Sequence, residues 1–272
     1  MDPEMNLYMK IRHLLSVEWL VIRKYTPFWV LSIMFMALLP LMNILIAKGI
    51  LRVGGGDINI LSNAYSFSHV WGNVSYWASI LVIFLTILII ILTTNDFQNR
   101  THRQRVIEGW LKKDYYHAKC LIVFIGSILT TCYVMFCGLA LGMLYGAMSN
   151  FPGNMYKLIY FWIYTLNYFG FAMLLSIFLK RSGLAIGVFI FYVFIIETIA
   201  VNLLNWQTKT KMGSFLPLES SDSLLPFPLN ALVKEVLQQT NEPAEWTYVL
   251  ASLIWVLLYY IIGRRKLLRS DW

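Results

Sequence analysis

The chain has 272 residues, of which 58% are hydrophobic and only 13% are charged, and its mean hydropathy is +0.63. Ordinary soluble domains carry about 25% charged residues, so this composition excludes that class and favours an α-helical membrane protein. The net charge of +8 is not a nucleic-acid signal. The basic residues lie at the ends of apolar segments rather than in one stripe, which is typical of membrane topology.

Residues 5–25 come before the first long apolar run and have the spacing of an amphipathic helix. The apolar side chains recur at helical intervals, at Leu7, Ile11, Leu14, Leu15, Trp19 and Ile22. This pattern predicts an interfacial helix in the headgroup plane, after which the chain turns into the membrane at Thr26-Pro27. Such a helix acts either as a simple anchor or as a mechanical element.

Six segments are long and apolar enough to cross a bilayer, whose core requires about 20 apolar residues. They are 28–47, 74–94, 120–145, 156–179, 184–204 and 246–263. We therefore expect an all-α fold with one transmembrane domain that covers residues 1–272. If both termini are cytoplasmic, the inner segments hold 16 of the 22 basic residues. The positive-inside rule favours this orientation.

The connection between the second and third spans is short and basic. Its sequence, residues 95–119, is NDFQNRTHRQRVIEGWLKKDYYHAK. Val106, Ile107, Trp110 and Leu111 form a small apolar face behind the arginines. The loop is therefore expected on the cytoplasmic side, either held by phosphate headgroups or docked to a soluble partner.

The connection between the fifth and sixth spans, residues 205–245, is unusually long and is interrupted by Pro217, Pro226 and Pro228. A helical apolar face follows these prolines, made by Leu229, Leu232, Val233, Val236 and Leu237. The predicted short helix either packs against the outer ends of the spans or dips into the membrane as a re-entrant element. In either position, the helix could cap an exit route or simply cover the spans.

Glu197 is the one ionisable residue that stands out within the apolar spans. A carboxylate facing lipid costs a few kcal/mol, so Glu197 is expected to face the bundle interior, a cavity or a subunit contact. It either marks a polar or protonatable point on a transport route or fixes helix packing. Gly138, Gly142 and Gly146 lie four residues apart and predict the close approach of another helix, either in the same subunit or in a second one.

Sequence motifs for catalysis and metal binding are absent. The chain has no GxxxxGK[ST], HExxH or GxSxG, and Cys120, Cys132 and Cys137 match no zinc spacing. We therefore expect no enzyme activity, no cofactor and no metal on this chain.

The layout and the 95–119 loop resemble the permease subunits of type-2 ABC transporters, the membrane halves of many bacterial exporters. In that family the loop after the second span is a coupling helix with an acid, an Arg-Thr, an apolar patch, a basic-aromatic stretch and a lysine. The matching positions here are Asp96, Arg100, Thr101, Val106, Ile107, Gly109, Tyr115, Tyr116 and Lys119. Asp96 replaces the usual Glu, and Lys112-Lys113-Asp114 stands where an arginine is commoner.

The resemblance implies an ATP-driven exporter subunit in the bacterial plasma (inner) membrane, with both termini cytoplasmic and a re-entrant element between spans five and six. A separate ATP-binding subunit would carry ATP and Mg, and a second permease, identical or different, would complete a dimer surrounded by membrane lipids. The residues expected to dock the ATPase are Asp96, Arg100, Thr101, Arg103, Arg105, Val106, Ile107 and Trp110. The alternative is a proton-coupled secondary carrier that uses Glu197.

Overall fold

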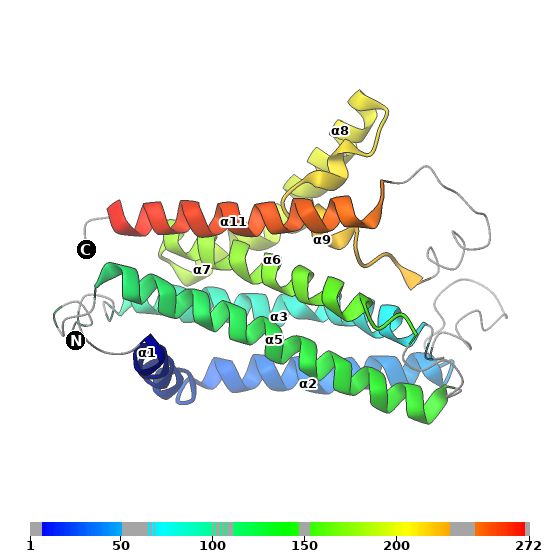
Figure 1. Cartoon of the computed structure of the whole chain (residues 1–272), viewed down its shortest axis with the longest axis horizontal. Coiled ribbons are helices and arrows are strands. Elements are labelled where there is room, and N and C mark those ends of the chain that lie inside the picture. Colours follow the sequence, from blue (N-terminus) through cyan, green and yellow to red (C-terminus); the bar gives the residue numbers. More distant parts are fainter. Residues whose placement is uncertain are drawn as a thin grey trace.

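The computed structural model describes residues 7–50, 65, 67, 69–99, 101, 104, 107, 111–146, 153–228 and 243–269. Within these ranges the secondary structure is helical, and no strand occurs. Figure 1 shows the long helices lying side by side in one bundle. The predicted helix around Leu229–Leu237 lies outside the described residues.

Six helical runs in the described residues are long and apolar enough to span a membrane, which confirms the six predicted spans. They are α2 (Thr26–Ala47), α3 (Val70–Gln98), α5 (Lys112–Tyr145), α6 (Lys157–Leu179), the run Ser182–Thr208, and α11 (Glu245–Arg269). Most extend beyond the predicted limits because polar residues continue the helix past the apolar core. For example, α5 begins at Lys112, two turns before the apolar run that starts at Cys120. This is the architecture of a multi-pass membrane protein.

The predicted N-terminal helix is α1 (Leu7–Ile22), and it lies at one end of the bundle at an angle to α2 (Figure 1). The corner between the two helices is held by the indole N–H of Trp29, which donates to the carbonyl oxygen of Arg23 at 2.9 Å. Pro27 occupies the first turn of α2, where its missing N–H costs nothing. The C-terminal end of α11 lies at the same end of the bundle (Figure 1).

The centre of the bundle is α6, which packs against α3, α5 and α11. In the apolar 18-residue stretch of α6, 67% of the residues are buried, against 22% in the corresponding stretch of α2. Helix α6 is therefore the span least available to lipid. Aromatic rings stack along it, with Tyr164 and Tyr168 only 4.3 Å apart between centroids. The aromatic residues of the fourth span therefore serve mainly as packing between helices.

The predicted glycine seam brings α5 close to the start of α3. A Cβ atom on Gly138 would lie 3.0 Å from the Trp71 ring, and one on Gly142 would lie 2.9 Å from the Phe67 ring. These contacts are shorter than normal van der Waals distances, so a side chain at either position would force the facing ring to shift. The seam packs within the subunit, which is one of the two predicted alternatives.

The fifth span is not one regular helix. It consists of α7 (Ser182–Phe191), the π-helical segment η2 (Tyr192–Glu197) and α8 (Thr198–Thr208). Helix α8 leaves the bundle at an angle (Figure 1), and π-helical turns are a known cause of such bends. The chain then reverses at Lys209, which has a left-handed φ of 51°, and returns through η3 (Met212–Phe215) and α9 (Glu219–Asp222).

Candidate functional site

A buried ionic network joins three helices at the end of the bundle that carries α1. The Lys119 ammonium lies 2.6 Å from the Asp96 carboxylate and 3.0 Å from the Glu18 carboxylate. Asp96 belongs to the last turn of α3, Lys119 to the second turn of α5, and Glu18 to α1. All three residues are at most 4% exposed. Removing the Lys119 ammonium would take away the cation that both buried carboxylates share, which is strongly destabilising.

The network extends into the basic loop. The Thr101 hydroxyl donates to Asp96 Oδ1 at 3.2 Å, and the Tyr115 hydroxyl donates to Asp96 Oδ2 at 3.1 Å. Asp96 therefore accepts bonds from the loop, from the start of α5 and from Lys119. We call Glu18, Asp96, Thr101, Tyr115 and Lys119 the loop-base network.

The end of α3 is also tied to the fifth span. The Gln98 side-chain amide donates to the Ser182 hydroxyl at 3.3 Å, and the Lys180 ammonium lies 5.7 Å from the centroid of the Phe97 ring. Lys180 ends α6 in the left-handed conformation, with φ of 55°. The base of the loop thus contacts the α6–α7 turn as well as α1 and α5.

The predicted docking residues divide into two groups among those that the structure describes. Asp96 and Thr101 belong to the loop-base network, whereas Ile107 is 85% exposed. Thr101, Gln104 and Ile107 all have helical backbone, as expected for a helix in this loop. The other predicted residues lie outside the described residues, namely Arg100, Arg103, Arg105, Val106 and Trp110.

Glu197 lies in the bundle and not on its lipid-facing surface, since it is only 4% exposed. One carboxylate oxygen accepts two backbone hydrogen bonds, from Leu218 N–H at 2.6 Å and from Glu219 N–H at 3.0 Å. These N–H groups stand at the start of α9, so Glu197 satisfies donors that a helix start otherwise leaves unpaired. The predicted inward orientation of Glu197 is confirmed. The side chain is bound by the segment from Lys209 to Asp222, which we call the returning segment.

The returning segment reaches the midpoint of α6. The Tyr168 hydroxyl donates to Asp222 Oδ1 at 2.9 Å, and the Asn167 side-chain amide donates to the Pro217 carbonyl oxygen at 2.7 Å. Burial raises the pKa of Asp222 well above its usual range, and the nearby Glu219 carboxylate raises it further. Together, Asn167, Tyr168, Glu197 and Asp222 form what we call the mid-bundle polar cluster.

Some of these residues carried no sequence signal for their role. Glu18 reads as one charged position of an amphipathic helix, and nothing nearby in the sequence pairs it with Lys119. Tyr115 and Lys119 are four residues apart and therefore share a helix face, which is the one local indication of the loop-base network. Asp222 lies in a loop by composition, so its contact with Tyr168 was not predicted.

No protein-family model and no curated protein matches this chain. The role of both groups of residues is therefore inferred from their geometry. At the level of class, six apolar helices with a polar cluster buried among them fit a membrane transport protein.

Proposed function

We propose that this chain is the membrane-spanning permease subunit of an ATP-driven ABC exporter. In this proposal a second permease, identical or different, completes the translocation route, and a separate ATP-binding subunit supplies ATP and Mg. The observation that supports it best is the loop-base network, because it connects the basic loop to α1, α3 and α5 at once.

The mechanism is mechanical. A partner that moves the loop would carry the ends of α3 and α5 with it, because separating Asp96 from Lys119 breaks an ion pair in a buried place. Glu18 adds α1 to the same moving unit. Nucleotide-dependent docking would then bias the spans between inward-facing and outward-facing arrangements.

The segment from Lys209 to Asp222 is the re-entrant element in this proposal. Its contacts with Asn167 and Tyr168 support that assignment, since both residues lie midway along a span. The segment contacts α8 through η3, and Glu197 accepts hydrogen bonds from the Leu218 and Glu219 N–H groups. Its position would let it narrow or widen the outer half of the route.

The test is co-purification in detergent with ATP-binding proteins of the source cell, followed by ATP hydrolysis in lipid nanodiscs. We expect one stable ATPase partner whose activity depends on this chain, and we expect Arg105→Glu with Val106→Asp to abolish the association. A folded, monodisperse protein without an ATPase partner would overturn the proposal. So would a double variant that still binds the partner fully.

The mid-bundle polar cluster supports a second candidate, a proton-coupled carrier. Glu197 is buried and Asp222 is half-buried, and protonatable side chains within a bundle are typical of proton relays. This candidate predicts transport in proteoliposomes driven by a pH gradient without ATP. Loss of that transport in Glu197→Gln or Asp222→Asn would support it, and transport that requires ATP and an added ATPase would exclude it.

A further inference from the structure

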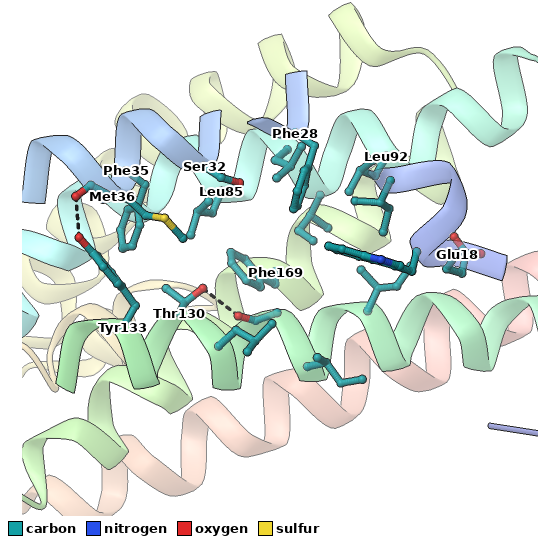
Figure 2. Close-up of a pocket in the computed structure, with 18 of the residues that line it drawn as sticks. Glu18, Phe28, Ser32, Phe35, Met36, Leu85, Leu92, Thr130, Tyr133 and Phe169 are labelled. Carbon is teal, nitrogen blue, oxygen red and sulfur yellow. Dashed lines mark hydrogen bonds between the residues drawn. The ribbon is translucent and has the colours of Figure 1, made fainter. Parts of the chain in front are cut away.

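An apolar pocket lies between α1, α2, α3 and α5, with Phe169 of α6 at its back (Figure 2). Its volume is about 420 Å³, which is within the usual range for small-molecule sites. Almost all of its wall is aliphatic or aromatic. Two side chains that line it, Met36 and Leu129, are 50% and 64% exposed, so the pocket communicates with the surroundings between α2 and α5.

The pocket is elongated along the helices, with Glu18 at one end and Tyr133 at the other (Figure 2). The Tyr133 hydroxyl closes the second end by donating to the Met36 carbonyl oxygen at 2.5 Å. The α5 residues that line the pocket run from Ile122 to Tyr133. At 1.5 Å per residue this is about 16 Å, close to half the roughly 30 Å hydrocarbon core of a bilayer. The pocket therefore has the depth of one leaflet.

Gly126 widens the pocket rather than permitting close helix packing. A Cβ atom there would meet only the Phe169 ring, at an ordinary 3.6 Å, in contrast with the clashes at Gly138 and Gly142. Glycine inside a helix is disfavoured relative to alanine. The packing of the protein does not require glycine here, and the space beside Gly126 adds to the pocket.

The end of the pocket near α1 carries positive charge. Arg23 and Lys24 are both exposed at the α1–α2 corner, between the pocket residues Ile22 and Phe28. Glu18 reaches the same end, but its carboxylate is bound to Lys119. Basic residues next to a pocket between membrane helices favour the head group of an anionic lipid.

We propose that this pocket holds one acyl chain of an anionic phospholipid from the leaflet on the α1 side, with the lipid phosphate beside Arg23 and Lys24. The chain would lie along α5 from Ile122 toward Tyr133, filling the space that Gly126 leaves. The site would tie α1 to α2 and α5 through a lipid. This inference does not depend on coupling to an ATPase.

The experiment uses the full chain in nanodiscs and phosphatidylglycerol with a photoreactive diazirine in its acyl chain. After irradiation, peptide mass spectrometry locates the labelled residues. We expect labels on 122–133 of α5 and 28–36 of α2. Phosphatidylcholine with the same chain should label these peptides about 25-fold less, because each of the two basic residues near an anionic head is worth roughly fivefold. Equal labelling by the two lipids would overturn the proposal.

Two pairs of variants test the chain and the head group separately. Gly126→Leu should remove most of the labelling, whereas Gly126→Ala should retain it because a Cβ fits. Arg23→Gln with Lys24→Gln should abolish the preference for phosphatidylglycerol. The matched control, Arg265→Gln with Arg269→Gln, removes the same charge from exposed positions on α11 and should keep it.

Unchanged labelling in a folded Gly126→Leu protein would overturn the proposal. If Gly126→Leu does not fold, the Arg23 and Lys24 pair decides. An undiminished phosphatidylglycerol preference in that surface variant would overturn the assignment of the head group and, with it, the site.

Discussion

Lys119 and Asp96 form a 2.6 Å ion pair that joins the two helices on either side of the basic loop. The pair is buried, and Glu18 from α1 lies 3.0 Å from the same ammonium. A surface ion pair contributes little to stability, but a buried one is costly to break. The geometry of the loop therefore depends on charges that no solvent screens.

The first prediction concerns this network. Lys119→Met should destabilise the protein by about 3–5 kcal/mol, because it leaves Asp96 and Glu18 without their shared cation. Thermal unfolding in detergent measures the loss. Adding Asp96→Asn and Glu18→Gln to Lys119→Met should recover part of it, since the two carboxylates that shared the ammonium are then neutral. A single variant as stable as the wild type would show that the ion pair does not hold the helices together.

The second prediction separates folding from docking. Ile107 is 85% exposed, so Ile107→Asp should change stability by less than about 0.5 kcal/mol. If the loop docks an ATPase, the same variant should weaken binding of that partner at least tenfold, as measured by surface plasmon resonance. Arg269→Asp is the control, because it adds an acid at an exposed position at the same end of the bundle. Equal binding by the two variants would argue against docking through Ile107.

The third prediction concerns Glu197. Glu197→Gln keeps an oxygen that accepts from the backbone N–H groups of Leu218 and Glu219, so the variant should fold and remain nearly as stable. Glu197→Ala leaves these donors unpaired and should cost about 1–3 kcal/mol. Thermal unfolding compares the two variants, and reconstituted transport tests function. Reduced transport by a stable Glu197→Gln protein assigns the acid a role in transport, whereas full transport assigns it a structural role.

The fourth prediction concerns glycine packing. Gly142→Ala places a methyl group 2.9 Å from the Phe67 ring and should destabilise the protein by about 1–3 kcal/mol. Gly187 is also in a helix, but a Cβ there meets nothing within 4 Å. Gly187→Ala should therefore stabilise the subunit by up to about 1 kcal/mol. Chemical denaturation of both variants measures the difference, and similar effects would mean that the seam between α5 and α3 is looser than described.

The spans and α1 could be predicted because their signals are local. An uninterrupted apolar run predicts a span, and the spacing of Leu15, Trp19 and Ile22 predicts an amphipathic helix, whatever the rest of the chain does. The inward orientation of Glu197 could be predicted for a similar reason, since a carboxylate is costly to place in lipid. Asp96, Thr101 and Lys119 could be grouped from the sequence only because they match the family pattern in the loop.

Most partners of these residues could not be predicted, because most of the contacts cross a long stretch of sequence. Glu18 meets Lys119 across 101 positions, and Tyr168 meets Asp222 across 54. The π-helical segment η2, which ends at Glu197, has the same kind of composition as an ordinary membrane helix. The lipid-sized pocket is likewise a product of packing, since Gly126 reads like any other small residue in a span.

The pairing of Glu18 with Lys119 also constrains the order of membrane insertion. Glu18 is synthesised before the first span, whereas Lys119 emerges with the third, 101 positions later. Until then neither Glu18 nor Asp96 has access to the ammonium that they share in the folded protein. Helix α1 can therefore make its final contacts only after the third span has left the ribosome, although it is the first helix of the chain to be synthesised.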